Sequence, residues 1–127
     1  MSKIERFEDL LCWQKARTLA NAVYEFTERS SFSRDARLRG QLQGAAGSVM
    51  HNIAEGFDSG SKPEFVRFLK MARRSASEIQ SELYLAKDRK YLTEQERQSA
   101  HDLATESKRL INGMINHLRG KVESDDT

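Results

Sequence analysis

One stretch of this chain, residues 63–90, carries apolar side chains at intervals of three and four along its whole length. This spacing places them on one face of an α-helix that is roughly 40 Å long. The apolar face consists of Phe65, Phe68, Leu69, Ala72, Ala76, Ile79, Leu83 and Ala86. Tertiary packing of such a face, rather than helix propensity alone, stabilises most helices in proteins. The rest of the chain must therefore supply partners for it.

Three further stretches share the same period: residues 9–29, residues 33–55 and the segment after residue 93. Four amphipathic helices with short connections predict an all-α, antiparallel up-down-up-down four-helix bundle over residues 1–120. Residues 121–127 include three acidic side chains and have little to bury. We expect them to form a disordered acidic tail.

Three stretches of sequence carry signals for the start of a helix. Ser33 is a candidate N-cap for the second helix. Ser61, which follows a small polar loop, forms a capping box with Glu64. Thr93 and Glu96 repeat that pattern before the last helix. These signals predict where the second, third and fourth helices begin.

The composition suits a globular protein without a membrane span. The chain has 127 residues, of which 38% are hydrophobic and 31% are charged, and its formal net charge is +2. No apolar run approaches the length of a membrane-spanning helix, and the start of the chain lacks the apolar core of a secretory signal. Cys12 is the single cysteine, so no internal disulfide can form. We expect one cytoplasmic domain that does not enter a membrane.

No arrangement of residues indicates catalysis. A di-iron bundle uses Glu-x-x-His pairs, and none of the three histidines follows a glutamate at that spacing. His51 and Glu55 stand one turn apart, but two ligands make a poor metal site. Cys12 lies on an apolar stripe, where it acts as a small buried hydrophobe. We expect a protein that is not an enzyme and needs no catalytic residue, metal or cofactor.

Clustered basic residues are the main candidates for a binding surface. Residues 62–90 hold eight basic and four acidic side chains, although the net charge of the whole chain is small. A solvated helix face is the ordinary interpretation of such charge, whereas the group as a whole favours binding to a polyanion. The predicted nucleic-acid-binding residues are Arg34, Arg37, Arg39, Lys62, Arg67, Lys70, Arg73 and Arg74. In an antiparallel hairpin the first three need not meet the other five within one subunit.

A second surface on the second helix is unusually rich in glycine. Gly40, Gly44, Gly47 and His51 cluster opposite the apolar stripe at 100° per residue. Each glycine in a helix interior costs about 0.5–1 kcal/mol relative to alanine. Two interpretations stay open: an exposed face that tolerates glycine, or close approach by another helix at a subunit interface.

The end of the same helix carries Asn52, Glu55 and Gly56. We interpret these three residues as a structural motif of the hairpin. Asn52 and Glu55 are expected to form hydrogen bonds with the backbone and basic side chains around residues 57–61. A role as ligand or acid is the alternative interpretation.

Several short motifs resemble one bacterial family, the four-helix-bundle proteins encoded in intervening sequences of 23S ribosomal RNA. The resemblance spans residues 7–118. The motifs are Phe7-Glu8-Asp9-Leu10, Trp13-Gln14-Lys15-Ala16, Tyr24, Ser48-Val49, Asn52-Ile53-Ala54-Glu55-Gly56, Glu64-Phe65, Phe68-Leu69, Ala72 with Ser75, Glu78-Ile79 and Tyr91-Leu92. The chain departs from the family at Gln43 and Gly44, where basic residues are common, and at Arg74, where a small residue is usual.

The resemblance implies a partner as well as a fold. The family is similar to the accessory variability protein of diversity-generating retroelements, a homopentameric barrel that binds nucleic acid and a reverse transcriptase. By resemblance, this chain is expected to form a ring-like homo-oligomer, a pentamer, with no established activity. The leading hypothesis is a non-enzymatic bundle that binds structured RNA or DNA through its basic surface. The alternative is an assembly or adaptor protein that docks a protein partner such as a reverse transcriptase.

Overall fold

The computed structural model describes residues 3–120, and within that range the chain forms helices and connections without a strand. The elements are the 3₁₀ turn η1 (Phe7–Asp9), α1 (Leu11–Thr27), α2 (Ser30–Ser33), α3 (Ala36–Asp58), α4 (Lys62–Asp88) and α5 (Glu94–Arg119). Four of these helices are long, and α2 is a single turn. The predicted all-α helical bundle is confirmed.

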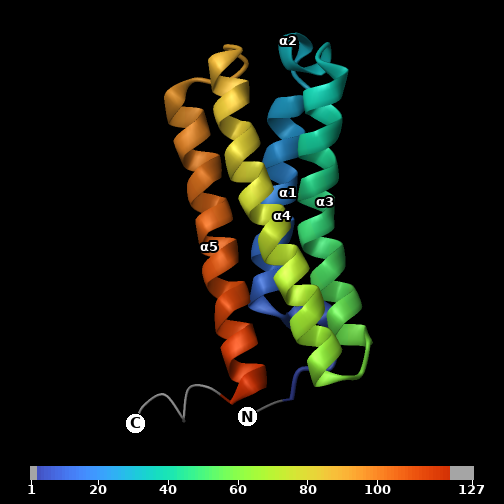
Figure 1. The fold of residues 1–127 in the computed structure, drawn as a ribbon. Helices are drawn as coiled ribbons and strands as arrows, with labels where there is room; N and C mark the ends of the chain where they lie inside the picture. The colour runs from blue at the N-terminus through green and yellow to red at the C-terminus, as the bar shows by residue number, and fades with distance from the viewer. Residues whose placement is uncertain (1–2, 121–127) are drawn as a thin grey trace.

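Each long helix packs against two others, because α1 contacts α3 and α5, and α4 contacts α3 and α5. Successive long helices run in opposite directions, as Figure 1 shows. One end of the bundle holds η1, the α3–α4 loop and the end of α5, and the other end holds α2 and the α4–α5 connection. The up-down-up-down order is thus present within one subunit, while assembly into a ring stays a prediction.

The core is built from the apolar stripes that the sequence predicts. In α4, seven of the eight predicted residues are buried, and Phe68 is half-buried at the edge. Buried apolar side chains from α1, α3 and α5 complete one continuous core. At about 25 cal/mol per Å² of apolar surface removed from water, this burial is the main stabilising contribution to the fold.

The helix boundaries correct three expectations. Asp35, rather than Ser33, caps α3 by accepting a hydrogen bond from the backbone N–H of Leu38. Ser61 caps α4 as predicted, but the box is incomplete because the Glu64 carboxylate bonds to Arg67 instead of reaching back. The capping box of α5 is complete at Thr93. The α3 helix also continues through residues expected in the loop, to Asp58.

The short helix α2 lies within a segment that the sequence analysis treats as a simple connection. Its Phe32 is fully buried and stacks between Phe26 and Tyr91, with ring centroids 5.8 and 4.8 Å away. The Tyr91 hydroxyl donates to Asp35 at 3.0 Å, and this bond raises the pKa of Tyr91. Aromatic packing therefore closes this end of the bundle.

Hydropathy along the described helices agrees with their burial pattern. Within residues 3–120, no helix combines the length and the apolar character that a membrane span requires. The acidic tail expected at residues 121–127 lies outside the described residues.

Candidate nucleic-acid interface

The eight predicted basic residues do not form one surface in a subunit. Arg34, Arg37 and Arg39 lie at the end of the bundle that holds α2, whereas Lys62 and Arg67 begin α4 at the opposite end (Figure 1). This separation agrees with the antiparallel hairpin expected from the sequence. The candidate interface must therefore be built from a subset of these residues and their neighbours.

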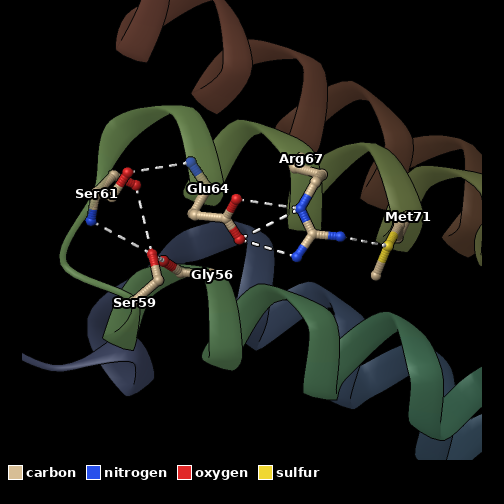
Figure 2. A network of polar contacts seen from close by, with 6 residues as sticks. All are labelled: Gly56, Ser59, Ser61, Glu64, Arg67 and Met71. Carbon is tan, nitrogen blue, oxygen red and sulfur yellow. Dashed lines mark hydrogen bonds and ion pairs between the residues drawn. The ribbon is translucent and has the colours of Figure 1, made fainter.

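Two of the predicted residues serve the fold. The Arg39 guanidinium donates to the backbone carbonyl of Ser33, which ties α3 to the α2 turn. Arg67 donates to both carboxylate oxygens of Glu64, at 2.8 Å for the shortest contact, and its guanidinium lies 4.6 Å from the Phe68 ring centroid. Figure 2 shows this contact beside the Ser61 cap and Met71.

The positive charge of Arg67 is already paired with the negative charge of Glu64. Hydrogen bonding from the Arg67 guanidinium holds the pKa of the Glu64 carboxyl below its usual value. The ionised carboxylate thus offsets the positive charge of the arginine at neutral pH. Arg67 is accordingly a weaker candidate for phosphate binding than its place in the sequence suggests.

Three other basic residues of α4 meet one basic residue of α5 around a shallow depression. It measures about 420 Å³ and lies over the α4–α5 seam. Its lining consists of Lys70, Arg73, Arg74, Ser77, Lys108 and Asn112. We call this surface the seam depression. It adds Lys108 and Asn112 to the candidate site, and neither of them is marked by the sequence pattern.

Two of these cations, Arg73 and Lys108, form hydrogen bonds with neutral groups. Arg73 donates to the Asn112 side-chain oxygen at 2.6 Å, and Lys108 donates to Ser77 at 3.1 Å and to Gln80 at 2.8 Å. Among the described residues, no carboxylate lies within 4.0 Å of a cationic nitrogen of Lys70, Arg73, Arg74 or Lys108. The seam depression therefore concentrates four positive charges that form no ion pair among the described residues.

The glycine-rich surface of α3 faces solvent within the subunit. A Cβ added at Gly40 or Gly44 would meet nothing within 4 Å, and one at Gly47 would contact the His51 ring at 3.6 Å. Gly40, Gly44 and His51 are exposed. This geometry leaves the face accessible without selecting between the two interpretations of its glycines.

Neither the single cysteine nor the possible metal ligands form a second candidate site in the described part of the chain. Burial raises the pKa of the Cys12 thiol to about 11, so the thiol is protonated at neutral pH and is a poor nucleophile. Across residues 3–120, no group of three His, Cys, Asp or Glu side chains is close enough to hold a metal ion.

Comparison with known proteins agrees with this helical architecture. Residues 8–113 match the model of a family described as 23S rRNA-intervening sequence protein. The chain belongs to this family. The match spans the four long helices nearly completely, from η1 into the second half of α5.

A solved structure supports the fold of this 23S rRNA-intervening sequence protein. It is a crystal structure of a protein with unknown function from the S23 ribosomal protein family of Bacteroides thetaiotaomicron VPI-5482. The TM-score is 0.75 at 22% identity, and the similarity covers 83% of this chain and 98% of that one. At this identity the similarity shows a shared fold. A comparison with curated proteins found no match.

The Asn-Ile-Ala-Glu-Gly run of this family member lies on the last turns of α3. Asn52 donates to the carbonyl and hydroxyl oxygens of Ser48, at 2.8 and 2.9 Å, and the Ser75 hydroxyl of α4 donates to the Ser48 hydroxyl at 2.9 Å. The expected contacts of Asn52 with the 57–61 loop are therefore wrong. Asn52 instead supports a polar link between α3 and α4, and Glu55 is exposed.

Gly56 has a clear packing role. A Cβ there would lie 2.8 Å from the Phe68 Cβ and 2.9 Å from a ring carbon of Phe65. Its carbonyl also accepts hydrogen bonds from the backbone N–H and the hydroxyl of Ser59. Glycine at this position thus permits α3 and α4 to approach closely at the hairpin.

Proposed function

We propose that this family member is a non-enzymatic, homo-oligomeric helical bundle that binds structured RNA, or another nucleic acid, through the basic surface of α4 and α5. One observation supports it most: four cations line the seam depression, and the two that form hydrogen bonds there, Arg73 and Lys108, have neutral partners. The cations are Lys70, Arg73, Arg74 and Lys108.

Nucleic acid is the ligand class that such a surface favours. Phosphate oxygens accept hydrogen bonds from lysine and arginine, and displaced counterions make binding stronger at low salt. Lys70, Arg73 and Lys108 are half-buried, so each loses part of its hydration without gaining an anionic partner in the described subunit. A polyanion would supply that partner along the length of the seam.

A pair of fourfold alanine variants tests the proposal. The first replaces Lys70, Arg73, Arg74 and Lys108. The matched control replaces Arg6, Arg29, Arg67 and Arg109, each of which has a carboxylate partner. Both variants lose the same formal charge, so they separate local geometry from net charge.

The expected result is that the seam variant retains a structured RNA far more weakly than the wild type in a low-salt gel shift, whereas the control retains it like the wild type. An equal loss of RNA binding in both variants would show that binding depends only on net charge, which would contradict the proposed site. A specific protein that co-purifies with the wild type at high salt, without RNA binding, would favour an adaptor role instead, with a partner such as a reverse transcriptase.

The proposed assembly, a pentamer, is tested separately through the exposed glycine surface. Leucine at Gly44 has open space within the subunit, so Gly44→Leu is expected to keep the fold. If Gly40, Gly44, Gly47 and His51 form the subunit interface, the substitution will reduce the mass measured by light scattering from five copies of the 14.6 kDa chain to a smaller species. An unchanged mass would remove this face from the interface.

A further inference from the structure

The centre of the seam depression brings together two cations from different helices. Arg73 on α4 is held by Asn112 on α5, and Lys108 on α5 is held by Ser77 and Gln80 on α4. Each cation therefore reaches across the seam to a neutral group on the other helix. This reciprocal arrangement fixes both positive charges next to the same hollow.

The orientation of Lys108 is supported by a second layer of hydrogen bonds. Gln80 accepts from Lys108 through its side-chain oxygen, and its amide nitrogen donates to the His101 carbonyl at 3.2 Å and to the Thr105 hydroxyl at 2.9 Å. These donations orient the Gln80 oxygen toward the ammonium group. Lys108 is thus held in place before any ligand arrives, which lowers the entropic cost of binding.

The neutral groups at the rim add donors of their own. Asn112 accepts from Arg73 through its oxygen, so its amide nitrogen can donate to a ligand. Ser77 accepts from Lys108, and its hydroxyl hydrogen can likewise turn toward the hollow. Two cations and two neutral donors suit an anion with several acceptor oxygens, such as a phosphate group.

We propose that the seam depression seats a single phosphate group of a nucleic-acid backbone between Arg73 and Lys108. Lys70 and Arg74, which line the same depression, meet the neighbouring phosphates. This assignment rests on the proposed function and adds to it a defined phosphate position. We call this position between Arg73 and Lys108 the seat. It differs from a diffuse basic face because α4 and α5 must keep their register to form it.

An almost isosteric substitution tests the seat. Asn112→Asp places a carboxylate beside Arg73, where it forms an ion pair and competes with the phosphate. Asn112 is exposed, so the fold is expected to tolerate the change. Asn21→Asp, on the exposed face of α1, adds the same charge away from the seam depression and serves as the control.

Two measurements follow each variant. Binding of a structured RNA over a series of salt concentrations should weaken on the order of tenfold in Asn112→Asp, with a salt slope smaller by about one, while Asn21→Asp stays near the wild type. Inorganic phosphate, followed by NMR shifts of the Asn112 and Lys108 amides, should perturb the wild type and not Asn112→Asp.

The outcomes separate the seat from the wider proposal. If the fourfold seam variant loses RNA but Asn112→Asp binds like the wild type, the seat is wrong and the proposed function stands. If the wild type binds no RNA at low salt, the proposed function itself fails. If inorganic phosphate perturbs the seat and RNA does not displace it, the source is free phosphate and the backbone assignment is overturned.

Discussion

The two seams of α4 are built from different chemistry. Toward α3, the helices meet through a buried glycine, aromatic rings and a hydroxyl–amide network, and the nearby Arg67 has its own carboxylate partner. Toward α5, the middle of the seam carries Arg73 and Lys108 with neutral partners. One helix thus presents a charge-balanced side and a side with excess positive charge.

This difference in hydrogen-bond partners indicates which basic residues are available to a ligand. An arginine that donates to a carboxylate must lose that contact, or share it, before it binds phosphate. A cation held by an amide or hydroxyl exchanges a neutral acceptor for an anionic one and gains Coulomb energy. Counting basic residues along α4 therefore overstates the role of Arg67 and misses Lys108 altogether.

The largest effect on stability is expected from a substitution that prevents the close approach of α3 and α4 at Gly56. Gly56→Ala forces a Cβ against Phe65 and Phe68 and should lower the free energy of unfolding by about 1–3 kcal/mol. Gly44→Ala, where the added Cβ meets open space, should raise it by about 0.5–1 kcal/mol. Urea denaturation of both variants checks the pair, and similar values for the two would contradict close packing at Gly56.

A second prediction uses pH to compare two carboxylates, Glu94 at the start of α5 and Glu82 within α4. Hydrogen bonding from Arg97 lowers the pKa of Glu94 to about 2 from 4.5, so its stabilising contribution is present above pH 4.5 and is lost as the pH falls toward 2. Glu94→Gln should therefore melt below the wild type at pH 7, and the difference should shrink on acidification.

The pKa of Glu82 is shifted in the opposite direction to that of Glu94. Burial, with the nearby Glu78 charge, raises its pKa, so its ionised form disfavours the folded state at neutral pH. Glu82→Gln should melt above the wild type at pH 7, and acidification that protonates Glu82 should remove the difference. Melting temperatures between pH 2 and pH 7 test both variants. Equal pH profiles for Glu94→Gln and Glu82→Gln would show that these environments are assigned wrongly.

The smallest effect is expected at the polar link between α3 and α4. Asn52→Ala removes two hydrogen bonds to Ser48 and should cost about 1 kcal/mol of stability, seen as a lower melting temperature. RNA binding should change less than stability, since Asn52 lies outside the seam depression. A variant of normal stability that binds RNA poorly would instead make Asn52 a site residue.

Most of the fold could be predicted because it depends on local patterns. The period of apolar residues in α4 identifies its buried face. Ser61 and Thr93 mark the starts of α4 and α5, because each side chain accepts a hydrogen bond from a backbone N–H three positions later. The errors are also local. Asp35 competes with Ser33 as the cap of α3, and Phe32 pulls the connection into a helical turn by entering the aromatic stack.

The candidate site was harder to predict because it depends on the register between helices. Arg73 and Asn112 are 39 positions apart, and nothing in either segment indicates that they meet. Helical spacing places Arg67 and Arg74 on the same face of α4. Glu64, however, stands one turn before Arg67 and forms an ion pair with it. An i, i+3 acid is a signal that the sequence does contain, so the Arg67 pair could have been found.

The salt dependence of RNA binding is the most direct test of whether cations with neutral partners are the ones that meet phosphate. Log affinity should be measured against log salt concentration for the wild type, the fourfold seam variant and the matched control variant. The seam variant should show a slope smaller by about three, because each phosphate contact contributes roughly 0.7–0.9, while the control keeps the wild-type slope. Equal flattening in both variants would contradict the distinction between the two sides of α4.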